Sequence, residues 1–265
     1  MQPSPSAPAG AMNPAHYRRE IVEALIARLL PLSGVRACFE GGSAATGRID
    51  DFSDIDLVIV APLTAAEAAF DAVESGLSAR TRISHVWRVE PPPFPDTAQR
   101  FYFLADAPRF FAVDCVVATE SGVQAFLERE RHGDPLVYFD RGLKMRARPA
   151  DQEALADRRA RRRTQLQGAV PVYGMLVEKE LARGRPLEAF GFYQALLRAL
   201  LEVLGMEHRP DRFDFGWRYV QTQLPDDARA LLAHYVFVAD EHALEERSPR
   251  LVAELQRRLA HLPPS

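Results

Sequence analysis

Residues 39–60 read FEGGSAATGRIDDFSDIDLVIV, and this stretch decides the fold. It begins with a glycine-rich turn and ends in an apolar run that carries Asp54 and Asp56. Because side chains alternate between the two faces of a strand, a strand over this run places both carboxylates on one face. Two carboxylates on one small patch repel each other, which favours a divalent cation between them. The spacing therefore predicts a metal site.

The turn upstream of the two acids has the features of an anion site. Gly41 and Gly42 carry no side chain, so the backbone can turn sharply. Its amide groups and the Ser43 hydroxyl can then approach an anion closely. Arg48 is near enough in sequence to contact phosphate oxygens, the alternative being a simple loop arginine. We therefore expect a phosphate cradle made of Gly41, Gly42, Ser43 and Arg48.

The turn, the short loop with Gly47 and Arg48, and the run Ser53-Asp54-Ile55-Asp56-Leu57 together resemble the signature of the DNA polymerase β nucleotidyltransferase superfamily. The similarity is to its aminoglycoside-type and minimal branches, and the motif covers only a small part of the chain. The resemblance implies that the glycine-serine turn holds a nucleoside triphosphate and that the strand acids bind two Mg²⁺ ions. It also implies ATP as the donor and a third acid on a later strand.

Asp114 is the candidate for this third acid. It lies inside the apolar run Phe110–Val117, where a carboxylate is costly unless a cation or a donor meets it. The alternatives are an aspartate on a solvated face or one paired with an arginine. Asp54, Asp56 and Asp114 are therefore the predicted catalytic and metal-binding residues.

Composition limits the class of protein. The chain has 265 residues, of which 47% are hydrophobic, so we expect one or two domains with a real core. A net charge of -3 disfavours a nucleic-acid partner and favours a small substrate. Cys38 and Cys115 are predicted to be buried thiols, without a disulfide or zinc. We see no membrane-spanning run or signal pattern and expect a cytoplasmic protein; the oligomeric state stays open.

Periodicity and breakers predict a loose tail over residues 1–12, an α/β nucleotidyltransferase domain over 13–146 and an all-helical domain over 147–265. The α/β domain is expected to be a mixed sheet with flanking helices, and the second domain a helical bundle. Asn13 is a predicted N-cap, and capping boxes are predicted at Thr64–Glu67 and Ser121–Gln124. Helices are expected over 13–30, 64–74 and 186–204, and strands over 35–39, 82–89, 100–104, 109–117 and 135–139.

Several charged residues outside the motif could have either a functional or a structural role. Glu90, Glu178 and Glu180 are rival candidates for a general base towards an acceptor hydroxyl. The arginine run over 158–163 is either a phosphate-binding surface or a solvated helix face, and the second is the favoured interpretation.

Arg229 and His234 superficially resemble the Arg-x4-His motif of HEPN ribonucleases, which often partner minimal nucleotidyltransferases. Ala230 stands where a polar residue usually follows that arginine, so a plain helix face is favoured.

The sequence as a whole predicts a Mg²⁺-dependent nucleotidyltransferase that moves AMP from ATP onto a small-molecule hydroxyl, with an aminoglycoside-like acceptor as one possibility. One alternative is AMP transfer onto a protein, as in the antitoxin-like minimal nucleotidyltransferases. Another is a non-catalytic nucleotide-binding regulatory module, against which the intact acids argue.

Overall fold

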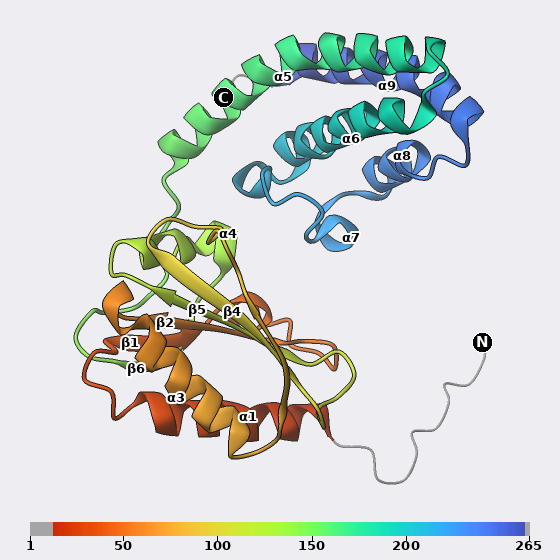
Figure 1. The fold of residues 1–265 in the computed structure, drawn as a ribbon. Coiled ribbons are helices and arrows are strands. Elements are labelled where there is room, and N and C mark those ends of the chain that lie inside the picture. Colours follow the sequence, from red (N-terminus) through yellow and green to blue (C-terminus); the bar gives the residue numbers. More distant parts are fainter. Residues whose placement is uncertain (1–12, 263–265) are drawn as a thin grey trace, which may run out of the picture. The chain divides into compact units, whose positions relative to one another are not determined.

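The structure is a computed structural model that describes residues 13–262. The tail predicted over residues 1–12 lies outside this range. The chain divides into two compact units, Met1–Pro149 and Ala150–Ser265. The first is a mixed sheet with flanking helices and the second is helical (Figure 1). The predicted fold class is confirmed.

The first unit is built on a six-stranded sheet in the order β3-β4-β5-β2-β1-β6. Strands β2 and β5 pair in parallel, and the other neighbours pair antiparallel. The predicted strands, including the one at the β6 edge, are confirmed to within a few residues. The bounds are β1 (Ala37–Glu40), β2 (Ile55–Val60), β3 (Ile83–Arg88), β4 (Thr97–Leu104), β5 (Ala112–Ala118) and β6 (Leu136–Asp140).

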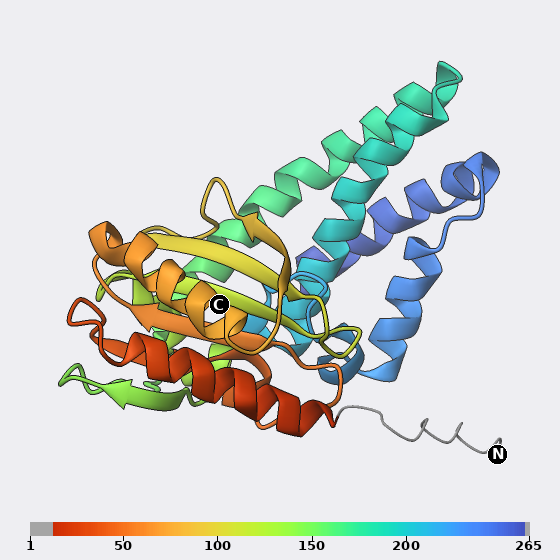
Figure 2. The ribbon, with the colours of Figure 1, turned by 60° about the horizontal axis from the view of Figure 1, so that its bottom comes forward.

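Helices cover the sheet unequally. The helices α1 and α3 lie side by side on one face (Figures 1 and 2). The main core fills the space between them and the sheet, with Ile55, Leu57 and Ile59 of β2 in it. A smaller cluster around Val58 and Val116 covers part of the opposite face. The helices are α1 (Pro14–Leu29), α2 (Gly42–Ala45), α3 (Ala66–Ser78) and α4 (Arg129–His132), with 3₁₀ turns at Leu63–Ala65 and Gly122–Phe126.

The helix starts show where local sequence decides structure. The Asn13 side chain accepts hydrogen bonds from the amides of Ala15 and His16, as predicted for an N-cap. The Thr64–Glu67 capping box is wrong, because the chain enters α3 through a 3₁₀ turn without a side-chain cap. The Glu67 carboxylate accepts instead from Arg100 at 2.6 Å.

The second predicted capping box, Ser121–Gln124, is also wrong. The segment is a 3₁₀ helix, and Thr119 rather than Ser121 accepts the hydrogen bond from the Gly122 amide, at 3.0 Å.

Both cysteines of the unit are buried free thiols, as predicted, and burial raises the pKa of Cys38 and of Cys115.

The second unit is a set of packed helices around α6. Its most buried residues include Tyr193, Leu200 and Leu204, and the Tyr193 hydroxyl donates to the main-chain oxygen of Tyr235 at 2.8 Å. Helix α6 runs one turn further than predicted. The helices are α5 (Gln152–Ala182), α6 (Pro186–His208), α7 (Val220–Gln223), α8 (Asp226–Val236) and α9 (Glu241–His261), with a 3₁₀ turn at Pro210–Arg212.

Against the sequence-based expectation, α6 is long and apolar enough to cross a membrane by length and composition. Within the described residues it is the one helix that passes this test, and 61% of its most apolar window is buried. Such burial is typical of the core helix of a folded domain.

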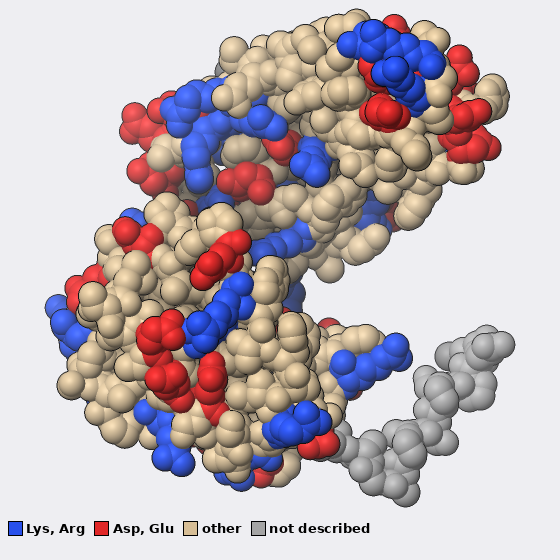
Figure 3. Space-filling view, viewed as in Figure 1, with Lys and Arg blue, Asp and Glu red and all other residues tan. Residues whose placement is uncertain are grey.

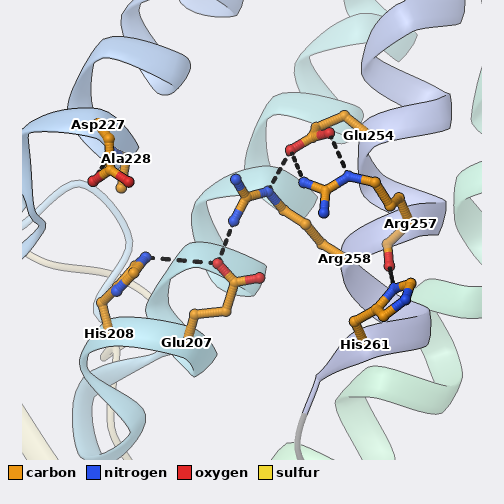
Figure 4. A network of polar contacts seen from close by, with 8 residues as sticks. All are labelled: Glu207, His208, Asp227, Ala228, Glu254, Arg257, Arg258 and His261. Carbon is orange, nitrogen blue, oxygen red and sulfur yellow. Dashed lines mark hydrogen bonds and ion pairs between the residues drawn. The ribbon is translucent and has the colours of Figure 1, made fainter.

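A polar network connects the end of α6 to α9 (Figure 4). Arg258 binds both Glu207 and Glu254, and hydrogen bonds from Arg257 and Arg258 lower the pKa of Glu254.

A buried ion pair fastens α1 to the sheet. Arg18 on α1 donates to the carboxylate of Glu40, the last residue of β1, at 3.1 Å, and Glu40 is fully buried. The Tyr138 hydroxyl donates to the same carboxylate. Arg18 also donates to the main-chain oxygen of Asp54 at 3.2 Å. One guanidinium therefore holds both ends of the segment that joins β1 to β2.

We expect Glu40→Gln to lower the free energy of unfolding by about 3 kcal/mol, because it leaves Arg18 buried without its counter-charge. Urea denaturation measures the loss. The matched control is Glu120→Gln, which removes the partner of Arg36 from an exposed pair at 3.3 Å and should cost under about 1 kcal/mol. Equal losses in the two variants would contradict the assigned role of the buried pair.

Candidate active site

Two of the predicted acids lie opposite each other. Asp56 on β2 and Asp114 on β5 are register partners in the parallel pair, so their side chains leave the same face of the sheet. This face is the one opposite α1 and α3, because Ile55 and Leu57 point into the core beneath those helices. Both aspartates are partly buried. We call Asp56 and Asp114 the aspartate pair.

Asp54 lies just outside strand β2. Strand β2 begins at Ile55, so Asp54 precedes it and the alternation of strand side chains does not fix its direction. In the chain from residue 13 to 262, no group of three or more His, Cys, Asp or Glu side chains is arranged to hold a metal ion. The strand register therefore brings Asp56 and Asp114 together, and the role of Asp54 as a metal ligand stays a prediction.

The glycine turn, Gly41–Gly42, packs directly against Asp56. Gly41 donates its amide to the main-chain oxygen of Asp56 at 2.9 Å. Gly42 begins the single-turn helix α2 and has a φ of +50°. A Cβ at Gly42 would lie 1.6 Å from Oδ2 of Asp56, so a side chain at this position would collide with the carboxylate. Glycine is required here both for the backbone conformation and for the close approach.

The Ser43 hydroxyl is a second notable feature of the turn. Its Oγ is buried and has no hydrogen-bond partner within the described part of the chain. A buried hydroxyl without a partner costs free energy, which a ligand oxygen at this turn would recover. Arg48 is exposed, and its Nε donates to Oγ1 of Thr46 at 3.1 Å. Its contact with phosphate stays a prediction.

Gln99 is a site residue that the sequence did not reveal. Its Nε2 donates to Oδ1 of Asp114 at 2.7 Å, which orients that carboxylate. Gln99 and Phe101 alternate onto the same face of β4, where Phe101 is the register partner of Asp114. The sequence predicted this strand only from residue 100, so Gln99 fell outside it. Knowing the register of the β4–β5 hairpin would have placed Gln99 next to Asp114.

The residues at this site fit a magnesium-bound nucleotide. Carboxylate oxygens are the ligands that Mg²⁺ prefers, and the aspartate pair presents two carboxylates on one face. The buried Ser43 hydroxyl and the side-chain-free Gly42 lie at the turn beside them. The arrangement can bind a cation and an anionic group next to each other.

The three candidates for a general base differ in their surroundings. Glu90 follows β3 and is exposed, and Glu178 on α5 is also exposed. Glu180 is only 7% exposed and accepts from Arg183 at 2.9 Å, with Arg185 at 3.6 Å. Glu180 therefore stabilises the turn between α5 and α6, which favours a structural role over that of a general base.

The arginine run on α5 is used within the helical unit. Arg162 donates to Glu202 at 3.0 Å, and Arg163 donates to main-chain oxygens at the end of α9. The other members, Arg158, Arg159 and Arg161, contact Asp214, the Pro210 oxygen and Asp157. On the face drawn in Figure 3, basic and acidic side chains are interspersed. The interpretation as a structural helix face is the better supported one.

Arg229 also has a structural role. Its guanidinium donates to the main-chain oxygens of Gln221 at 2.7 Å and Leu224 at 3.2 Å, and it pairs with Asp226. These contacts join α7 to α8. With His234 on the same helix, this favours the plain helix interpretation over the nuclease motif.

No protein-family model matches the sequence, and no curated protein matches it either. Several solved structures share a general likeness with this chain, two of which are the following. One is the STING-associated CdnE c-di-GMP synthase from Capnocytophaga granulosa, with 15% identity, a TM-score of 0.29, and coverage of 94% of this chain and 82% of that one.

The other is the spectinomycin adenyltransferase AAD(9) from Enterococcus faecialis, solved with ATP and spectinomycin. It has 12% identity and a TM-score of 0.32, and the match covers 94% of this chain and 100% of that one. At these TM-scores the likeness is distant, so the functional conclusion rests on the site.

We expect Gly42→Ala to weaken the binding of Mg²⁺-ATP by at least about tenfold, because the new Cβ displaces the Asp56 carboxylate. Isothermal titration calorimetry measures the affinity. Gly47→Ala is the matched control: its φ of +65° imposes similar backbone strain, but nothing lies within 4 Å of its Cβ. If both variants lose affinity equally, backbone strain and not the carboxylate contact is responsible.

Proposed function

We propose that this protein is a Mg²⁺-dependent nucleotidyltransferase that transfers AMP from ATP to a hydroxyl group of a small molecule of the aminoglycoside kind. One observation carries the proposal. The aspartate pair shares the sheet face opposite α1 and α3, and Gly42 is packed directly against the Asp56 carboxylate. A cation held by the pair and an anion bound at the turn would then adjoin each other, as transfer of a phosphoryl-linked group requires.

Asp56 and Asp114 would hold the metal, with Asp54 as a further proposed ligand from the preceding loop. When bound, Mg²⁺ neutralises phosphate charge and favours the ionised form of the acceptor hydroxyl. Gln99 keeps the Asp114 carboxylate in one orientation through its 2.7 Å hydrogen bond. The turn at Gly41, Gly42 and Ser43 would bind the triphosphate.

The protein has little covalent chemistry to perform in such a reaction. An acceptor oxygen attacks the α-phosphorus while pyrophosphate departs on the opposite side, so placement and charge neutralisation supply most of the acceleration. Glu90 is exposed at the end of β3, and we propose that it accepts the proton from the acceptor hydroxyl.

We predict that Asp56→Asn and Asp114→Asn each reduce Mg²⁺-dependent pyrophosphate release from ATP by at least about 100-fold. Asparagine keeps the shape but removes the charge that holds the cation. The metal-free melting temperature should stay unchanged or rise, because the repulsion between two adjacent carboxylates is relieved. The assay contains ATP, Mg²⁺ and a panel of aminocyclitol compounds. Asp51→Asn, an exposed aspartate in the preceding loop, is the control and should retain wild-type rates.

Undiminished release in both variants would refute the proposed role of the pair. If radiolabel from ATP appeared on a co-purified protein and not on a panel compound, the acceptor would be a protein and the small-molecule acceptor would be refuted. Binding of Mg²⁺-ATP to the wild type without any turnover would make the chain a nucleotide-binding module.

A further inference from the structure

A row of side chains continues outward from the aspartate pair across the sheet. Asp56 is the register partner of Asp114, Asp114 is the partner of Phe101 on β4, and Phe101 is the partner of Trp87 on β3. Directly opposed residues on neighbouring strands share a face. The four side chains therefore form one transverse line on the face that α1 and α3 leave uncovered.

The outer half of this line is an aromatic platform. The rings of Trp87 and Phe101 are stacked, with centroids 5.3 Å apart and an angle of 18° between their planes. Trp87 is 53% exposed. In the next row, His85 and Phe103 pair at 5.9 Å, and Phe103 is 44% exposed. We call Trp87 and Phe101 the aromatic platform.

The platform lies on the opposite face of β4 from the protein core. Arg100 and Tyr102, which flank Phe101, are buried on the α3 side, where Arg100 binds Glu67 and Glu74. A stacked pair of large rings on an uncovered sheet face offers an apolar surface that can bind a ligand. The position of these two rings beside the reacting groups indicates what that ligand is.

The order of the parts across the sheet matches the order of groups in an in-line transfer. The glycine turn connects β1 to β2, the aspartate pair lies on β2 and β5, and the platform lies on β4 and β3. If the turn binds the departing pyrophosphate and the aspartate pair, as the metal site, lies beside the α-phosphate, the attacking oxygen comes from the far side. The far side is the aromatic platform.

We propose that Trp87 and Phe101 bind the acceptor, and that the acceptor is a hydroxyl-bearing ring compound, such as an aminocyclitol or sugar, whose C–H face stacks on the Trp87 ring. This inference rests on the proposed function, since it uses the direction of nucleotidyl transfer. Flat indole rings bind the apolar faces of rings, and a ring amine over the indole gains further attraction from the ring face. Trp87 is a specificity residue for the acceptor.

Steady-state kinetics of pyrophosphate release test this with the panel compound, spectinomycin included, that supports the fastest release. Trp87→Ala should raise the KM of that compound by roughly tenfold or more and leave the KM of ATP within about twofold. Trp87→Phe should retain most of the acceptor affinity, because it keeps a stacking ring.

Fluorescence supplies a readout that is independent of turnover. The chain has two tryptophans, so Trp217→Phe leaves Trp87 as the sole emitter and Trp87→Phe leaves Trp217. Trp217 is 51% exposed in the helical unit and is a matched control. The panel compound should quench emission in Trp217→Phe and leave emission in Trp87→Phe unchanged.

The failures of the two proposals are distinguishable. A wild-type enzyme that releases pyrophosphate, combined with an unchanged acceptor KM in Trp87→Ala, overturns the platform and leaves the proposed function standing. A raised KM for ATP in that variant assigns the platform to the nucleobase and also overturns the inference. A wild type that releases no pyrophosphate with any panel compound overturns the proposed function and, with it, this inference.

Discussion

The parallel pairing of β2 with β5 is the constraint on which the site depends. Both strands are largely buried, and their pairing places Asp56 directly opposite Asp114. A shift of one residue would turn one carboxylate towards the core beneath α1 and α3. The apolar residues on the core-facing side, including Leu57 and Cys115, prevent that shift. The same packing that stabilises the fold therefore also determines the spacing of the proposed metal ligands.

A second constraint keeps the glycine turn against the pair. Glu40, the last residue before the turn, and the main-chain oxygen of Asp54, just before β2, are both held by Arg18. Between these two anchor points, the Gly41 amide binds the Asp56 oxygen, and Gly42 leaves room for the carboxylate. The loop between the anchors is therefore fixed at both ends, while Ser43 presents a hydroxyl without a described partner.

The sequence predicted those parts of the fold that local patterns encode. The Asn13 cap and the helix that follows it depend on neighbouring residues, and they appear where expected. The two capping boxes failed because tertiary contacts outweighed them: Arg100 on a distant strand takes the Glu67 carboxylate. The burial of Glu180, which identifies it as structural, likewise depends on packing that a single sequence does not reveal.

The site was only partly predictable for a related reason. The glycine turn and the aspartates could be identified because their spacing is local, whereas Gln99 and the pairing of Trp87 with Phe101 depend on hairpin register. Register follows from strand ends and bulges, such as the one between Ile83 and His85, which a single sequence does not reveal. Asp54 shows the converse: its spacing suggested a shared strand face, but the strand begins one residue later.

The central claim is that Asp56 and Asp114 hold a cation next to a triphosphate bound at the Gly42–Ser43 turn. Anomalous diffraction from a crystal soaked with Mn²⁺ and a non-hydrolysable ATP analogue tests it directly. The account predicts manganese density bridging both carboxylates, with the polyphosphate against the turn. Manganese bound away from either aspartate, or a nucleotide bound elsewhere on the protein, would contradict it.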